Sequence, residues 1–200
     1  METFLINLKY RPDRLKQFVG EAKREEINYE RIDAINGKEI NRKEYWINKY
    51  DNRRSLKPGE IGVYLSHYEC MEKSKQDFAL IFEDDAKLCL NFKDKLNILM
   101  EKVPEDWDIL LLGTTKLWKR KYRSKCQLLP TAEDEYFYKV SGDIYGLQGY
   151  VINKKAINHL IDCKFPIMGP IDVIINNIGL NVYISKEELV GTHQMGSNTQ

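Results

Sequence analysis

The chain has 200 residues, of which 42% are hydrophobic and 30% are charged. This length suits one α/β domain better than two independent domains. The 31 basic and 30 acidic residues leave a formal net charge of +1, so no overall field draws the chain toward nucleic acid or an anionic membrane. Any anion that it binds must be held by a local group of side chains.

The amino-terminal residues do not resemble a targeting segment. Charged residues follow the short apolar run of residues 1–9 too soon for a signal peptide. The sequence contains no run of about 18 apolar residues, which is the length needed to span a bilayer. The four cysteines lack the close pairing of a zinc ribbon or a redox motif. We therefore expect a cytoplasmic protein with reduced thiols, which would meet a membrane-bound acceptor from solution.

Periodicity and turn signals predict buried strands alternating with amphipathic helices. In chain order the predictions are a strand over residues 4–8, a helix over 12–26, a strand over 29–33, a short helix and a loop over 40–56, a helix from 57 to about 71, a strand over 78–82, a helix over 92–103, strands over 107–112, 136–140 and 147–152, helices over 154–163 and 170–178, and a strand over 182–185. The opening strand–helix–strand unit predicts a mostly parallel sheet. Residues 1–200 would form one domain, with 185–200 as a mobile tail that folds over a site or frays.

Three acidic residues, Glu83, Asp84 and Asp85, follow the most apolar predicted strand. Ligands of open α/β sheets bind at the carboxyl ends of strands, and alternation along an extended segment should point Glu83 and Asp85 the same way. Two carboxylates about 4 Å apart repel by roughly 4 kcal/mol at an effective dielectric of 20. A hard cation, Mn²⁺ or Mg²⁺, would remove that repulsion and could bind a diphosphate. The alternative is an ordinary acidic turn after a strand.

Five segments, in the same order, resemble glycosyltransferase family 25, which includes bacterial lipooligosaccharide galactosyltransferases and collagen galactosyltransferases. The segments are residues 4–14, 31–37, 59–67, 79–86 and 149–156. The resemblance implies a GT-A-type fold, Rossmann-like, with a mostly parallel central sheet flanked by helices. It also implies a divalent metal, inversion at the sugar carbon, a nucleotide-sugar donor that is most often UDP-galactose, and a glycan or glycolipid acceptor such as lipooligosaccharide.

The family pattern implies a nucleotide pocket at the ends of the first strands. Its donor-binding residues would be Asn7, Leu8, Arg11, Arg14, Asp33, Ala34, His67 and Asp84. Arginines beside a helix start favour phosphate, although both could instead be solvated residues of that helix start. Asp33 could accept from a base N–H or form a local turn. His67 could be an ordinary packing residue of its helix.

An inverting transfer needs a base that takes the proton of the acceptor hydroxyl. Asp172 is the first candidate, although an acid near a helix start could simply stabilise the helix dipole. Asp143 is the second, in a glycine-flanked loop that could close over the donor, and Glu83 would serve if Asp85 alone held the metal. His193 is a candidate metal ligand beside Glu83 and Asp85, although imidazole is softer than Mn²⁺ or Mg²⁺ prefers.

Other functions stay open. The basic stretch 116–125 could contact an anionic acceptor or lipid head groups at a membrane surface, or be solvated. A non-catalytic module that binds nucleotide-sugars or glycans would share the fold. A metal-dependent phosphohydrolase or nucleotidyltransferase would also place carboxylates after a strand, but the nucleophilic aspartate with a partner lysine, or the glycine-rich phosphate loop, of those classes is not evident.

Overall fold

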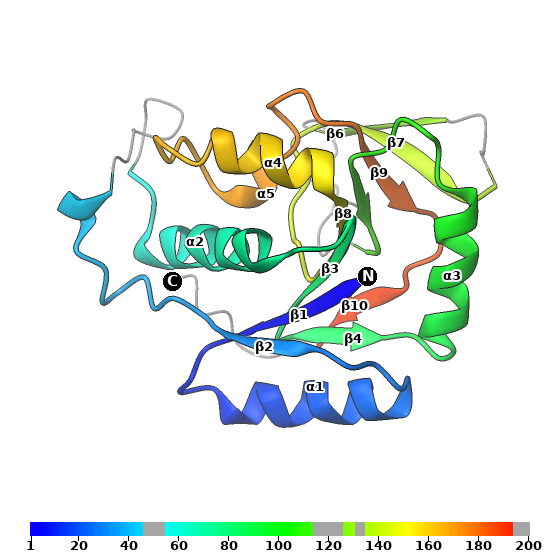
Figure 1. Cartoon of the computed structure of the whole chain (residues 1–200), viewed down its shortest axis with the longest axis horizontal. Coiled ribbons are helices and arrows are strands. Elements are labelled where there is room, and N and C mark those ends of the chain that lie inside the picture. Colours follow the sequence, from blue (N-terminus) through cyan, green and yellow to red (C-terminus); the bar gives the residue numbers. More distant parts are fainter. Residues whose placement is uncertain (46–54, 114–125, 131–134, 194–200) are drawn as a thin grey trace.

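A central sheet of eight strands lies between helices in the computed structural model (Figure 1), which describes residues 1–45, 55–113, 126–130 and 135–193. The elements in chain order are β1 (Glu2–Asn7), α1 (Pro12–Arg24), β2 (Glu30–Asp33), the 3-10 helix η1 (Arg42–Glu44), α2 (Pro58–Lys73), β3 (Phe78–Glu83), β4 (Ala86–Leu88), α3 (Phe92–Lys102), β5 (Ile109–Leu111), β6 (Cys126–Pro130), β7 (Phe137–Gly142), β8 (Gly149–Asn153), α4 (Lys154–Asp162), α5 (Ile171–Ile174), β9 (Val182–Ser185) and β10 (Val190–Thr192). No helix among these residues is long and apolar enough to cross a bilayer.

The strands of the large sheet are ordered β2-β1-β3-β8-β5-β9-β7-β6. β1 pairs in parallel with β2 and β3, and β5 pairs in parallel with β9. β8 is antiparallel to both β3 and β5, and β7 is antiparallel to both β9 and β6. Six strands therefore run one way and two, β7 and β8, run the other. The predicted fold class, GT-A-type α/β with a mostly parallel sheet flanked by helices, is confirmed.

Alternation along the strands divides the hydrophobic core into two layers. Phe4 and Ile6 of β1 belong to the layer that contains the buried faces of α2 and α4. Leu5, between them, belongs to the layer of α1 and α3. Because helices cover both faces, the central strands are almost wholly apolar, as is usual for buried parallel strands.

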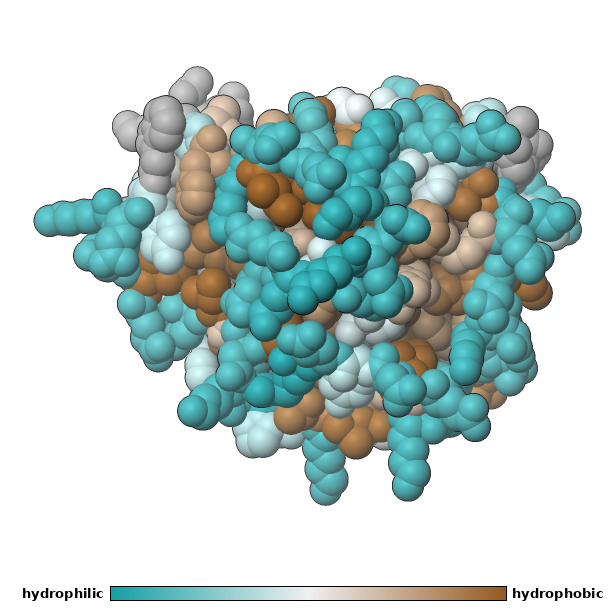
Figure 2. Space-filling view, viewed as in Figure 1, coloured by the Kyte–Doolittle hydropathy of each residue, from teal (hydrophilic) through white to brown (hydrophobic). Residues whose placement is uncertain are grey.

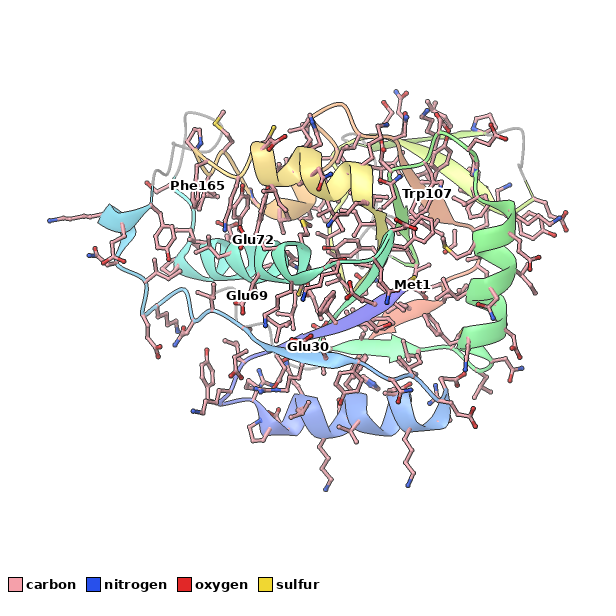
Figure 3. All side chains as sticks on the ribbon, in the orientation of Figure 1. Met1, Glu30, Glu69, Glu72, Trp107 and Phe165 are labelled. Carbon is pink, nitrogen blue, oxygen red and sulfur yellow. The ribbon has the colours of Figure 1, made fainter. Side chains whose placement is uncertain are left out.

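The surface over α2 and α4 is mainly hydrophilic, with small apolar areas between the polar side chains (Figure 2). Most residues of α2 are nevertheless buried. Glu69 and Glu72 lie on its outer side (Figure 3). α2 is thus a core helix, and its inner side can supply residues to a site in the interior.

Three short strands, β4, β6 and β10, were missing from the predicted elements. β4 and β10 form an antiparallel pair in which Ala86 lies opposite Thr192. β4 and β10 have three residues each, which is too few to give a periodic pattern. Residues 185–193 of the predicted tail therefore contain a paired strand, and residues 194–200 lie outside the described part of the chain.

Other predicted boundaries differ more modestly. The helix predicted over 12–26 ends at Arg24, and the helix predicted over 170–178 is the four-residue α5. η1 begins the segment predicted over 40–56, of which residues 46–54 lie outside the described part. The strands predicted near 78–82 and 182–185 match β3 and β9.

Two glycines let the loop after β2 lie directly against α2. A Cβ added to Gly62 would lie 2.4 Å from the Ile35 carbonyl oxygen, and one added to Gly37 would lie 1.6 Å from the Pro58 carbonyl oxygen. Ser66, one turn further along α2, accepts a hydrogen bond from the Ile35 N–H at 2.8 Å and donates to the Gly62 carbonyl at 2.7 Å. The loop is therefore fixed against the helix at several points.

Gly62→Ala should lower the free energy of unfolding by roughly 1–3 kcal/mol, because the new methyl group must displace backbone atoms. Chemical denaturation would measure the loss. Gly20→Ala on α1 is the matched control, since nothing lies within 4 Å of its added Cβ and replacing a helical glycine should stabilise by up to about 1 kcal/mol. A Gly62→Ala protein as stable as the wild type would contradict this packing.

Candidate active site

A cavity of about 350 Å³ opens where β1, β2 and β3 end at one edge of the sheet. Its size is in the range of small-molecule sites. Its walls are the strand ends, the loop after β2 and one side of α2, with lining residues Ile6, Leu8, Tyr10, Arg14, Ala34, Ile35, Asn36, Gly37, Lys38, Gly59, Val63, Ser66, His67, Glu83, Asp84 and Asp85. Five of the predicted donor-binding residues are among them: Leu8, Arg14, Ala34, His67 and Asp84.

The middle acid of the triplet is held by the protein itself. Asp84 is buried, and its Oδ1 accepts from Arg14 Nη1 at 2.7 Å. Its Oδ2 accepts from Asn7 Nδ2 at 2.7 Å. Asn7 in turn accepts from Arg31 Nε at 3.0 Å, so one hydrogen-bonded network joins the ends of β2, β1 and β3. Asp84 therefore fixes Arg14 and Asn7, and each of its oxygens already has a donor.

The two outer acids, Glu83 and Asp85, both line the cavity, as does Asp84 between them. Asp85 Oδ2 lies 3.6 Å from Arg14 Nη1. Asp85 Oδ1 is buried and has no hydrogen-bond partner within the described ranges. Burial, and then the neighbouring Glu83 carboxylate, raise the pKa of Asp85 above its usual value, because both disfavour a further negative charge.

A buried histidine contacts Glu83 from α2. His67 Nε2 lies 3.3 Å from Glu83 Oε1, and its Nδ1 lies 2.9 Å from the Tyr150 hydroxyl on β8. The His67 and Tyr150 side chains are both inaccessible to solvent. Complete burial raises the pKa of Tyr150 well above its usual value, so this hydroxyl keeps its proton. His67 thus connects the acidic triplet to the neighbouring strand.

Two predicted donor-binding residues form ion pairs outside the cavity lining. Arg11 donates to Asp13 through Nε at 2.9 Å and Nη2 at 2.8 Å. Asp33, at the end of β2, pairs with Arg31 Nη1 at 2.6 Å. Asn7 likewise acts from behind the cavity, through Asp84. Contact of Arg11 or Asp33 with a nucleotide would require these exposed pairs to rearrange.

The two proposed bases hold a loop in place. Asp172 Oδ2 accepts from the Gly146 N–H at 3.2 Å, and Asp143 Oδ1 accepts from Asn177 Nδ2 at 3.0 Å. Both contacts tie the segment between β7 and β8 to the segment around α5. Neither aspartate lines the cavity described above. A role as base would therefore need an acceptor that approaches from this side.

His193 reaches the triplet through its main chain rather than through its ring. Its N–H donates to the Asp85 carbonyl at 2.8 Å, while its Nε2 lies 3.2 Å from Glu21 Oε1 on α1. Within the described ranges, no three His, Cys, Asp or Glu side chains are grouped so that they could hold a metal ion. In this conformation the imidazole lies beside Glu21, although Nε2 has no hydrogen-bond partner among the described residues. The role of His193 as a metal ligand stays a prediction.

A divalent cation nevertheless fits the two outer carboxylates. Asp85 Oδ1 is buried with no hydrogen-bond partner among the described residues. Burial and the Glu83 carboxylate raise the pKa of Asp85 despite Arg14 at 3.6 Å, so the negative charge of Asp85 is poorly compensated. Mg²⁺ is commonly bound by one or two carboxylates, with substrate phosphates and water completing its shell. Glu83 and Asp85 would hold such an ion without a third protein ligand.

The sequence patterns missed several lining residues. Tyr10, Asn36 and Lys38 follow strand ends, where a loop residue gives no periodic signal. Ser66 and Gly59 lie in a segment that resembled the family, and their place against the loop after β2 could have been suspected from that segment alone. The other lining residues that the sequence patterns missed could be identified only from contacts between residues far apart in the chain.

Comparisons with known proteins agree with this architecture. The chain matches the family described as Glycosyltransferase family 25 (LPS biosynthesis protein) over residues 1–175. It is 30% identical over 166 residues to procollagen galactosyltransferase 1 of Danio rerio, which is 74% of this chain and 27% of that protein. It is 33% identical over 128 residues to inactive glycosyltransferase 25 family member 3 of Homo sapiens, which is 56% of this chain and 21% of that protein.

The chain spans about a quarter of the length of these curated relatives. Among solved structures, the crystal structure of the protein A197 from STIV is similar with a TM-score of 0.51 and 10% identity, covering 98% of this chain and 87% of that one. At this identity the likeness concerns the fold alone. The family match extends over most of the chain and includes every strand that contributes to the cavity. The chain therefore belongs to glycosyltransferase family 25.

Proposed function

We propose that the chain is a metal-dependent glycosyltransferase that moves a hexose, with galactose preferred, from a UDP-hexose to a glycan or glycolipid acceptor such as lipooligosaccharide, with inversion. Family membership supports transfer of a sugar, and the galactosyltransferases among the relatives support galactose. The observation that carries the proposal is the pair of outer acids in the cavity, one of which has a buried oxygen with no hydrogen-bond partner among the described residues.

The charge of the cavity supports the need for a cation. The lining contains three carboxylates, Glu83, Asp84 and Asp85, and two cationic side chains, Arg14 and Lys38. With the lining histidine counted as neutral, three negative and two positive groups leave a formal charge of −1. A diphosphate would therefore enter a site of its own sign. Bound between the carboxylates and the diphosphate, Mn²⁺ or Mg²⁺ would make the net formal charge of the site positive.

The residues around the ion would bind and orient the donor. Asp84 keeps Arg14 at the triplet, where its guanidinium can contact a phosphate. Lys38 adds a second positive charge from the loop after β2. Apolar side chains such as Ile6 and Val63 line the same cavity and can pack against the nucleoside. The bound ion would supply Lewis-acid stabilisation of the departing UDP.

The base that takes the acceptor proton stays a prediction. Glu83 lies in the cavity itself, whereas Asp172 and Asp143 hold the loop between β7 and β8. Asp172 and Asp143 are proposed for an acceptor bound against that loop. Glu83 is the alternative if Asp85 alone holds the ion.

A non-catalytic module is the second candidate, because inactive members occur among the relatives. Such a module would bind a nucleotide-sugar or glycan without turnover. A cytoplasmic location and peripheral contact with a membrane also stay predictions. The basic stretch 116–125, proposed for that contact, lies outside the described residues.

The donor and the metal can be tested together by calorimetric titration. UDP and UDP-galactose should bind at least about tenfold more tightly with Mn²⁺ than with a chelator, which corresponds to about 1.4 kcal/mol. Slow hydrolysis of UDP-galactose without an acceptor would separate a transferase from a binding module. Equal affinity with Mn²⁺ and with the chelator would contradict the metal site.

Replacement by asparagine should affect stability differently at the neighbouring acids Asp84 and Asp85. Asp84→Asn removes one partner of a buried ion pair and should cost roughly 3–5 kcal/mol of stability. Asp85→Asn should leave stability unchanged or higher, because burial and the Glu83 carboxylate disfavour the Asp85 charge more than Arg14 at 3.6 Å favours it. It should nevertheless abolish Mn²⁺-dependent turnover. Thermal unfolding and a transfer assay with saturating Mn²⁺ measure the two effects. Normal turnover in Asp85→Asn would exclude Asp85 as a ligand.

Asp172→Asn tests the first candidate base. As a base, it should lower kcat by about 10²–10⁴-fold while the affinity for UDP-galactose changes little. Asp143→Asn is the matched comparison, since Asp143 holds the other end of the same loop. A parallel loss of donor affinity in Asp172→Asn would show that the residue acts through the loop instead.

A further inference from the structure

A line of three side chains leads from the interior to the proposed metal site. Tyr150 lies on β8, His67 on α2 and Glu83 at the end of β3. The two contacts between them are 2.9 Å and 3.3 Å long. Of the three histidines in the chain, only His67 lines the cavity.

With Glu83 ionised, the two contacts favour one position for the imidazole proton. When the Tyr150 hydroxyl donates to Nδ1, the proton of the neutral ring is on Nε2, and Nε2–H donates to Glu83. A bare Nε2 would instead turn its lone pair toward an ionised carboxylate, which is repulsive. A doubly protonated ring also carries a proton on Nε2. In each favourable state His67 is therefore a donor to Glu83.

The geometry points to His67 as a positioning residue, held by Tyr150, that aims the Glu83 carboxylate at the divalent ion of the site. This inference rests on the proposed function, since it assumes that Glu83 is a ligand. Oε1 accepts from the buried imidazole, which leaves Oε2 for the ion. The Glu83 side chain is 30% exposed, whereas that of His67 is 0% exposed, so a fully buried group contacts a partly exposed one.

A hydrogen-bond donor that holds a metal-binding carboxylate in place has a large effect on metal binding. A ligating carboxylate is commonly fixed by a further hydrogen bond, and the loss of that bond typically weakens metal affinity by about 10–100-fold. Orientation matters more here because Asp84, the third carboxylate of the lining, already accepts from Arg14 and Asn7. Misplacing Glu83 would leave the ion with Asp85 as its single well-placed protein ligand.

The neighbour of His67 on α2 also contacts the cavity lining. The preceding residue, Ser66, accepts a hydrogen bond from the N–H of Ile35 in the loop after β2. Ser66 and His67 therefore contact two parts of the cavity lining, the loop and the acidic triplet.

The test is the affinity for Mn²⁺, measured by electron paramagnetic resonance of the free ion, with and without UDP and without any acceptor. His67→Leu removes the donor and should weaken Mn²⁺ binding by about 10–100-fold. His67→Gln keeps an N–H that can reach Glu83 and should restore most of the affinity. Tyr68→Phe, on the same buried helix, is the control and should bind Mn²⁺ like the wild type, because no contact joins its hydroxyl to His67 or Glu83.

The outcomes separate this inference from the proposed function. If the wild type binds Mn²⁺ and folded His67→Leu binds it equally well, His67 has no positioning role. Equal losses in His67→Leu and His67→Gln would show that packing, not the donated proton, is what matters. A wild type without affinity for Mn²⁺ would overturn the proposed metal site, and this role with it.

A second measurement needs no metal. Nitrogen-15 spectra of the imidazole rings should show the His67 proton on Nε2 in the metal-free wild type. A ring protonated on Nδ1 alone would contradict the inferred hydrogen bond to Glu83, whatever the protein's affinity for Mn²⁺.

Discussion

Three consecutive carboxylates follow one buried strand, and each needs a nearby positive or hydrogen-bond-donating group to stabilise its charge. The arrangement of the site follows from how this requirement is met. Asp84 accepts hydrogen bonds from Arg14 and Asn7, and Glu83 is contacted by His67. Asp85 has only the longer 3.6 Å contact with Arg14, and its Oδ1 has no hydrogen-bond partner among the described residues. Two of the acids thus have close donors, and the charge of the third is the least compensated, which is where a cation would bind.

The same groups organise the surrounding fold. Arg14 brings the start of α1 to the end of β3, and Asn7 connects β1 to β2 through Arg31. α2 fixes the opposite wall, because Gly62 allows the loop after β2 to approach its backbone. The cavity is therefore bounded by elements whose relative positions depend on buried polar contacts as well as on apolar packing. This explains why it can be preformed without a ligand.

The sequence allowed the fold class and most long elements to be predicted, because the apolar run of β3 and the helical period of α2 are strong local signals. It also predicted that Glu83 and Asp85 share one side of the strand. The role of Asp84 was not predictable, since Arg14 lies 70 positions away in the chain. His193 was predicted to bind the metal from its residue type, and only the structure shows its ring beside Glu21 of α1. Pairings of this kind become visible only in three dimensions.

Under the proposed function, turnover by this family member depends on a divalent cation in the site. Active and inactive relatives share the family, so membership alone does not establish turnover. The decisive measurement is a crystal of the protein grown with UDP and Mn²⁺, with diffraction recorded at the manganese absorption edge. We expect an anomalous peak within bonding distance of both Glu83 and Asp85 and of the diphosphate. UDP bound in the cavity with no such peak between these groups would contradict it.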